Sequence, residues 1–426
     1  MFEHYQLLVF MGGIAILLGL ASGIYPALFL AGFHPLGNLN GHFSSPLKGL
    51  LLRKVLVICQ FAIAMILMIA TLVLYLQVNF MQNQALGFKK EQQLVVGFQF
   101  DERVLNQQAT IKQTLQSVAG VDNVSFSSCI PGRVYHTYPT QLENAQKVMQ
   151  DFQANVYFVD EEFLSQYEIK VIVGRDFSPQ IASDMKQAIL INEAAAFQLG
   201  FLTLSDALGK KFNQLGFKGN IIGVVKDFHY HSYESKIQPL ILRMAPGFFT
   251  FMSIKVSSQS MQQVIEEVKE KWGQLLPEIP LVYFFADEAY DAQYKAEERF
   301  GSLFVYLTIM AILVSCLGLF GLSVMNTSGR VKEIGVRKIL GASGSNLYVL
   351  LSKENIKLIV ISMLIAIPIA NYFTSEWLNK FAYRITIPYW AFIIPAIMLF
   401  SISLLTIGSQ TVKTIRKNPV DSLRHE

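Results

Sequence analysis

Five long stretches of this sequence contain no charged residue, and they constrain the fold more than any other feature. They are Leu7–Phe33, Val55–Leu76, Gly301–Met325, Leu358–Phe373 and Trp390–Ile407. A helix rises about 1.5 Å per residue, so the second stretch would span about 33 Å, close to the hydrocarbon thickness of a bilayer. We predict a membrane α-helical bundle of about five transmembrane helices. The alternative, buried helices of a large soluble core, rarely stays free of charge over such lengths.

The Lys and Arg residues between these stretches predict the orientation of the chain. Residues 33–54, 326–357 and 411–426 together hold 13 Lys or Arg, whereas residues 1–6 and 374–389 hold only two. Short loops rich in Lys and Arg stay cytoplasmic. We therefore expect a multi-pass membrane protein, with its N-terminus and large middle segment outside the cytosol and its C-terminus inside.

The middle segment, residues 78–299, is predicted to fold as a large extracytoplasmic α+β domain. It holds 20 Lys or Arg against 25 Asp or Glu, so the chain's net charge of +4 reflects membrane orientation and does not indicate nucleic-acid binding. Short β-branched or aromatic runs predict strands, and helical spacing predicts helices. The strands are Gln93–Phe100, Asn123–Ser128, Gln153–Val159, Ala188–Asn192, Ile221–Val225 and Phe251–Val256; the helices are Gln107–Val118, Met261–Leu276 and Ala286–Arg299, the last continuing into the next apolar stretch.

Two places in this segment have residues of a chemical site. His229 and His231, beside Asp227, have the side chains to bind a transition metal, but no third ligand at metal-like spacing follows, and a strand end with polar turn residues explains the pattern better. Ser127-Ser128 and His136 have the groups of a nucleophile and a base, but no nucleophile elbow surrounds them. We expect no catalytic residue, metal or cofactor on this chain.

An ATP-driven function would need a second polypeptide. The sequence has no Gly-x-x-x-x-Gly-Lys-Ser/Thr loop, so ATP and Mg²⁺ would bind to a partner subunit. Gly341–Ser345 is rich in Gly and Ser but lacks the lysine and a preceding strand, which is typical of a turn between helices.

The charged segment before this turn is the best candidate for contact with such a partner. Glu333 and Arg337 are spaced i,i+4 in the favourable order, which predicts a short helix. Gly341 would end this helix, and Ser343 or Ser345 would cap the next one. Composition leaves two interpretations open: a helix that docks on a cytosolic protein, or a solvated positive-inside loop.

A set of short motifs runs along nearly the whole chain. These are Gly23–Ala27, Leu52-Arg53, Gln60-Phe61, Leu86–Phe88, Glu333–Arg337, Gly341-Ala342, Trp377-Leu378, Phe381–Arg384, Asn418–Val420 and Leu423-Arg424. In combination they resemble the FtsX-like permeases of ABC transporters with a MacB-like periplasmic core domain, in the long duplicated form. That form has eight spans, whereas this sequence has five charge-free stretches.

The resemblance implies a permease subunit of the mechanotransmission type in the bacterial inner membrane, with its large domain in the periplasm. ATP hydrolysis by a separate cytosolic ABC ATPase would move the charged loop and the long helices, and the outer domain would act in export or another envelope process. A periplasmic adaptor or envelope protein is a candidate partner. The residues implied to contact the ATPase are Glu333, Ile334, Gly335, Arg337, Lys338, Gly341 and Ala342. The alternative is a membrane-anchored extracytoplasmic sensor or scaffold without ATP coupling.

The resemblance also divides the chain into four regions. These are residues 1–54, the last span of a preceding repeat with a cytoplasmic linker; 55–77, a transmembrane helix; 78–299, the MacB-like core domain; and 300–426, the FtsX-like three-helix domain. His34–Leu39 echoes Asn418–Leu423, as duplicated units would. We expect the chain to be the C-terminal half of a longer permease, packed on a preceding repeat or a second copy through Gly12, Gly13 and Gly19.

Overall fold

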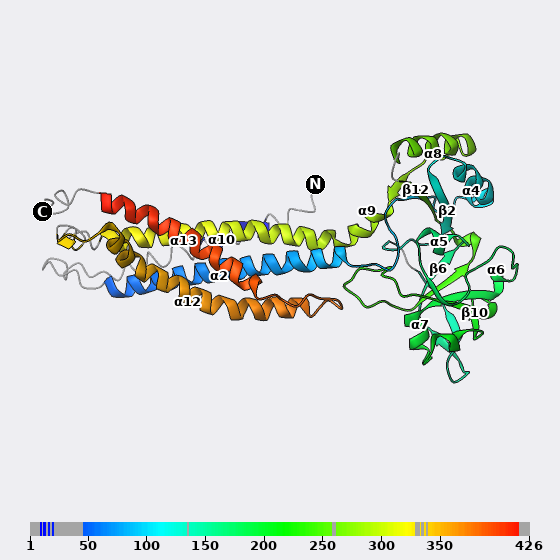
Figure 1. Cartoon of the computed structure of the whole chain (residues 1–426), viewed down its shortest axis with the longest axis horizontal. Helices are drawn as coiled ribbons and strands as arrows, with labels where there is room; N and C mark the ends of the chain where they lie inside the picture. Colours follow the sequence, from blue (N-terminus) through cyan, green and yellow to red (C-terminus); the bar gives the residue numbers. More distant parts are fainter. Residues whose placement is uncertain are drawn as a thin grey trace. The chain divides into compact units, whose positions relative to one another are not determined.

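The computed structural model of the chain describes residues 9–10, 12–13, 16–17, 19–20, 46–133, 136–257, 261–328, 333, 336–337 and 340–416 (Figure 1). The chain divides into two compact units, Met1–Cys59 and Gln60–Glu426. The contacts that position the candidate site lie within the second unit.

Four helices of the described chain are long and apolar enough to cross a membrane. They are α2 (Pro46–Asn83), α10 (Lys295–Ser328), α12 (Gly344–Leu378) and α13 (Trp390–Arg416). Each contains one of the predicted charge-free stretches, and Pro368 and Pro395 lie inside α12 and α13 without ending them. The remaining predicted stretch, Leu7–Phe33, lies mostly outside the described residues.

The described part of the outer segment forms one mixed sheet of thirteen strands. Its order is β13-β1-β12-β2-β6-β11-β8-β10-β9-β4-β5, with β3 also paired to β6 and β7 to β10. Two pairs are parallel, β10 with β8 and β11 with β6, and the others are antiparallel. The strands are β1 (Gln93–Gly97), β2 (Val121–Ser127), β3 (His136–Thr137), β4 (Thr140–Glu143), β5 (Met149–Phe152), β6 (Asn155–Val159), β7 (Val171–Gly174), β8 (Ala188–Asn192), β9 (Lys211–Gln214), β10 (Phe217–Val225), β11 (Leu240–Met244), β12 (Phe251–Val256) and β13 (Tyr283–Phe285).

Helices pack against both faces of this sheet, because central strands such as β6 and β8 are buried along their whole length. On one face, Val264, Val268 and Trp272 of the amphipathic helix α8 join the buried core together with Ile111 and Leu115 of α4. Figure 1 shows these two helices beside β12 and β2. The short helices are α3 (Glu102–Asn106), α4 (Gln108–Gln116), α5 (Phe163–Gln166), α6 (Asp184–Gln187), α7 (Glu193–Gln198) and α8 (Met261–Leu275), with 3₁₀ turns η2 (Leu204–Ala207) and η3 (Pro246–Phe248).

The predicted fold class, a helical membrane bundle with an α+β domain, is confirmed. All six predicted strands and both internal helices are present, and β8 and β12 match their predicted bounds residue for residue. The predicted continuity at Ala286–Arg299 is also confirmed, because β13 leads through α9 (Ala286–Asp291) and the 3₁₀ turn η5 (Ala292–Tyr294) directly into α10.

Candidate functional site

The charged segment between α10 and α12 contains a helix that precedes the turn at residues 340–343. Residues 333, 336 and 337 are helical, and Glu333 Oε1 lies 2.8 Å from Arg337 Nη2. The predicted i,i+4 pair is therefore confirmed. Both side chains are nearly half exposed, so the pair contributes only about 0.3–0.5 kcal/mol to the helix.

This helix ends on the residue that the sequence predicts. Gly341 has φ +88°, and the Ala342 N–H donates to the Arg337 carbonyl at 2.9 Å, the six-residue closure of a Schellman motif. Ser343 is the N-cap of α12, and its Oγ accepts from the Asn346 N–H at 3.3 Å. Two helices thus meet at a sharp turn stabilised by local hydrogen bonds.

The turn presents apolar as well as charged groups to its surroundings. Ala342 packs against Leu347 and Leu351 of α12, which fixes the turn to that helix. Leu340 is 80% exposed, and Val336 is 48% exposed. An exposed surface of mixed apolar and charged side chains is suited to protein contact.

The second candidate region lies where α2 and α9–α10 meet the outer domain, and we call it the outer joint. Its buried members come from α2, the segment after α2, the loop after β10, the α9–η5 helix and the segment after α12. They are Leu74, Val78, Met81, Leu86, Tyr233, Tyr290, Tyr294 and Phe381, with Phe80, Phe88, Trp377 and Tyr383 packed against them.

Gln77 anchors the segment after α12 to α2. Its side chain is fully buried. Its Nε2 donates to the Tyr383 carbonyl at 2.9 Å, and its Oε1 accepts from the Ile385 N–H at 2.9 Å. One amide thus satisfies two backbone groups of a chain segment 306–308 residues away.

The same segment also contacts the outer domain. The Ala382 N–H donates to the Glu234 carbonyl at 2.8 Å. The Tyr383 ring lies edge-on to Tyr233 at 5.3 Å and to His229 at 5.0 Å, and His229 stacks on Tyr233 with 3.6 Å between centroids. Residues 382–385 therefore join α2 to the loop after β10.

Tyrosine hydroxyls fix the remaining contacts of the outer joint. Tyr233 donates to the Ala85 carbonyl at 2.7 Å, and Tyr290 donates to the His231 carbonyl at 3.0 Å. Burial raises the pKa of Tyr233 to about 12, so its hydroxyl stays a neutral donor at physiological pH.

Known proteins share features with two parts of this chain. Residues 305–419 match the sequence profile of the family described as FtsX-like permease C-terminal. This segment is an FtsX-like permease domain. Over 297 residues, which cover 64% of this chain and 70% of that protein, the chain is 24% identical to the "Uncharacterized ABC transporter permease YvrN" of Bacillus subtilis (strain 168). The chain is thus homologous to an ABC transporter permease and is a membrane protein with an extracytoplasmic domain.

Solved structures similar to this chain include two extracytoplasmic regions. The periplasmic region of MacB from Actinobacillus actinomycetemcomitans is 14% identical, with a TM-score of 0.35, over 48% of this chain and 94% of that one. The extracellular domain of the "noncanonic ABC-type transporter YknZ from Gram-positive bacteria" is 15% identical, with a TM-score of 0.33, over 45% of this chain and 97% of that one.

The predicted ATPase-contact residues all fall within the FtsX-like domain, and the structure describes four of them. Glu333 and Arg337 form the ion pair, and Gly341 and Ala342 form the turn. Ile334, Gly335 and Lys338 lie outside the described residues. Their contact with an ATPase stays a prediction.

Gly12, Gly13 and Gly19, predicted to pack on a preceding repeat or a second copy, are helical, and a Cβ at each would meet nothing within 4 Å.

The two histidines considered as metal ligands have other roles in the structure. His229 stacks in the outer joint, and burial lowers its pKa to about 4. Asp227 Oδ1 accepts from the Ala194 N–H at 3.1 Å. Among the residues that the structure describes, no group of three His, Cys, Asp or Glu side chains is placed to hold a metal ion. The segment follows the end of β10 at Val225, as the turn interpretation predicts.

The serine–histidine arrangement is not assembled either. Ser128 Oγ accepts from the Phe158 N–H at 3.0 Å and lies 3.4 Å from Cys129 Sγ, whereas His136 is exposed and its ring faces Tyr138. Burial raises the pKa of Cys129 to about 11, so this thiol is a poor nucleophile at neutral pH.

No sequence pattern predicts the outer joint as a unit. The family motifs include Trp377 and Phe381, but no motif or pattern singled out Gln77 or Tyr233. The available signal was two aromatic-rich segments, 228–233 and 377–383, each beside a predicted helix or strand end. Only the tertiary structure brings them together.

Proposed function

We propose that this chain is the membrane subunit of an ABC transporter of the mechanotransmission type. A separate cytosolic subunit would bind ATP and Mg²⁺ and hydrolyse the nucleotide, and this chain would contribute no catalytic residue. It would lie in the inner membrane of a bacterium, with the sheet domain in the periplasm. The movement of that domain would drive export or another envelope process.

One observation supports this proposal above all: two long membrane helices are joined through short segments to neighbouring strands. β13 leads through α9 and η5 into α10, and α2 precedes β1, which pairs with β13. With 34 and 38 residues, α10 and α2 would extend about 51 and 57 Å, roughly 20 Å or more beyond a hydrocarbon core of about 30 Å. A shift of these helices would therefore act on one edge of the sheet.

Contacts between the two helices support a shared movement. Thr71 Oγ1 and Thr308 Oγ1 are 3.0 Å apart, and Gln82 Nε2 donates to Glu298 Oε1 at 2.8 Å. The Gln77 anchor adds the segment between α12 and α13 to the same assembly. In this proposal α2, α10 and the segment after α12 would then move together.

The coupling segment Glu333–Ala342 would receive the movement of the ATPase at the other end of α10. Its exposed Leu340 and its Glu333–Arg337 pair are suited to a protein contact, and its turn is fixed to α12 through Ala342. Regions 1–54, 55–77, 78–299 and 300–426 would be the functional units. The first would contact a preceding repeat or a second permease copy, and a periplasmic adaptor or envelope protein would bind the outer domain.

Single charge reversals in the coupling segment test the proposal. Glu333→Arg and Arg337→Glu should each weaken pull-down of the ATPase and the ATP hydrolysis stimulated by the permease, with membrane insertion unchanged. The double variant restores the ion pair but exchanges its ends, so it separates helix stability from docking. A docking contact predicts that the double variant remains impaired.

Lys380→Glu is the matched control, because Lys380 is exposed at the opposite end of α12. It should leave the pull-down unchanged. Wild-type pull-down and hydrolysis in both single variants would show that this segment does not couple the two subunits.

A further inference from the structure

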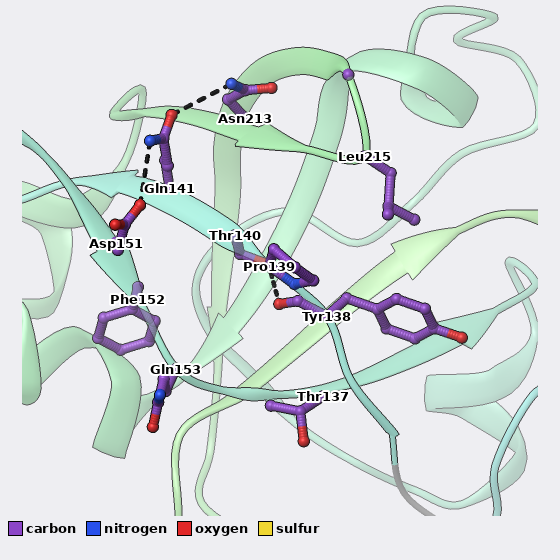
Figure 2. A pocket seen from close by; sticks show the side chains of 11 residues that line it. Thr137, Tyr138, Pro139, Thr140, Gln141, Asp151, Phe152, Gln153, Asn213 and Leu215 are labelled. Atoms are coloured by element: carbon purple, nitrogen blue, oxygen red, sulfur yellow. Dashed lines mark hydrogen bonds between the residues drawn. The ribbon is translucent and has the colours of Figure 1, made fainter.

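A pocket of about 660 Å³ opens on the outer domain and shares no residue with the outer joint. Three segments line it: the β3–β4 stretch, the end of β5, and the turn between β9 and β10 (Figure 2). Its volume lies within the range of about 300–1,000 Å³ typical of small-molecule sites.

A row of polar side chains crosses three strands at one side of the pocket. Gln141 of β4 is directly opposite Asp151 of β5 and Asn213 of β9. Asn213 Nδ2 donates to Gln141 Oε1 at 3.3 Å, and Gln141 Nε2 donates to Asp151 Oδ1 at 3.1 Å, as Figure 2 shows. With strands about 4.8 Å apart, the row extends about 10 Å. The mutual bonds orient the three groups and leave further donor and acceptor positions for a ligand.

An aromatic ring and an aliphatic side chain provide apolar surface. Tyr138 is half-buried, and its ring rests against Phe158 at 5.1 Å and edge-on to Phe248 at 6.1 Å, which fixes its orientation. Leu215 is exposed, with φ +52°, and Gly216 follows with φ +82°. Two successive left-handed residues form the turn type that favours Asn-Gly, so a leucine there costs about 1–2 kcal/mol. The turn places an apolar side chain at the rim of the pocket, and strain of this kind is found most often at functional sites.

The pocket is supported from behind by a buried polar network. Gln214 Nε2 donates to Thr140 Oγ1 at 2.8 Å, and Arg243 Nη1 lies 3.3 Å from Gln214 Oε1. Gln214 and Arg243 are both almost completely buried, and the Arg243 guanidinium lies 4.1 Å from the Phe217 ring. Strands β4 and β9 are therefore held together beneath the pocket, which preorganises the polar row.

We propose that this pocket binds a neutral polyhydroxylated ligand, an oligosaccharide segment. Sugar hydroxyls both donate and accept, so they pair with the amides of Gln141 and Asn213 and with the carboxylate of Asp151. The C–H face of a sugar ring packs on Tyr138 and Leu215.

Other ligand classes fit this lining less well. Among the described residues that line the pocket there is no Lys, Arg or His, so an anion would meet Asp151 without a compensating charge from them. A wholly apolar ligand would cover the polar row and leave its groups unpaired, at a cost of about 1–3 kcal/mol each.

The full-length chain in lipid nanodiscs is the material for the test, because detergents with sugar headgroups would compete. The probes are maltotriose, cellotriose and the trimer of N-acetylglucosamine, measured by calorimetry and saturation-transfer NMR. At least one should bind saturably, and Gln141→Ala and Tyr138→Ala should each weaken it by about tenfold. Tyr138→Phe keeps the ring packing and should weaken binding less. Gln146→Ala, on the exposed β4–β5 turn outside the pocket, should not change it.

Three results would overturn the proposal. These are no saturable binding of any of the three sugars, equal binding by the wild type and the Gln141→Ala variant, or binding of tri-alanine in their place with the same dependence on Tyr138. Gln141 is exposed, so its alanine variant should fold normally, as the thermal unfolding midpoint would verify. The experiment needs no ATPase, and its outcome is independent of the proposed coupling function.

Discussion

Replacing Gln77 by Met should loosen the segment after α12 while leaving α2 helical. Methionine has a similar volume and a high helix propensity, so the change removes mainly the amide. The Ile385 N–H loses its acceptor, and the Tyr383 carbonyl loses its donor, both at 2.9 Å. Each lost bond costs about 1 kcal/mol, and more where water cannot replace it. Since residues 383 and 385 are half-buried, we expect local opening to become easier by about 1–2 kcal/mol, or about 5- to 30-fold.

Hydrogen–deuterium exchange with mass spectrometry on the full-length chain in nanodiscs measures this effect. Peptides covering residues 379–386 should exchange faster in the Gln77→Met variant by that factor. Gln82→Met is the matched control, because Gln82 lies on the same helix and its side chain donates to Glu298 and not to the segment after α12. If exchange of residues 379–386 is the same in Gln77→Met as in the wild type, Gln77 does not anchor this segment and the account of the outer joint is wrong.

Three further predictions concern the outer domain. Residues 80–297, expressed without the membrane helices, should unfold cooperatively, since over 200 residues can bury a substantial core; a gradual transition would contradict this. Gly132→Ala should destabilise the domain by about 1–3 kcal/mol in denaturant titration, because φ is +88° and the new Cβ would lie 2.5 Å from the Tyr290 ring; a loss below about 0.5 kcal/mol would refute it. The pKa of His229 is about 4 in the folded chain, against an ordinary 6.5, so between these pH values the unfolded chain binds a proton that the folded chain does not. The free energy of unfolding should therefore be highest above pH 6.5 and decrease as the pH falls toward 4. In the His229→Phe variant the unfolding midpoint should change less with pH over that range. If the midpoint depends on pH as steeply as in the wild type, His229 is not the cause.

Local interactions made much of the helical part predictable. The Glu333–Arg337 pair, the Gly341 turn and the Ser343 cap connect residues at most five apart, so residue type and spacing are enough to expect them. The bounds of β8 follow in the same way, because a run of apolar residues there ends at polar ones.

Strands that depend on distant partners were not predictable in this way. β11 was missed because Arg243 interrupts its apolar run, and that charge is buried only where Phe217 and Gln214 pack around it. β4, β5 and β9 are short and polar on one face, and they exist through their pairing with one another.

The sequence by itself determined that this chain has apolar helices of membrane length and that a separate α+β domain lies between them. These properties depend on the local density of charge and on periodicity, which a single segment possesses alone. Only the tertiary structure decided which residues join the two parts. Gln77 bonds to Tyr383 and Ile385, and β13 pairs with β1, across separations of roughly 190 to 310 residues. Buried polar groups need hydrogen-bond partners, and the fold supplies these partners from segments that are distant in the sequence.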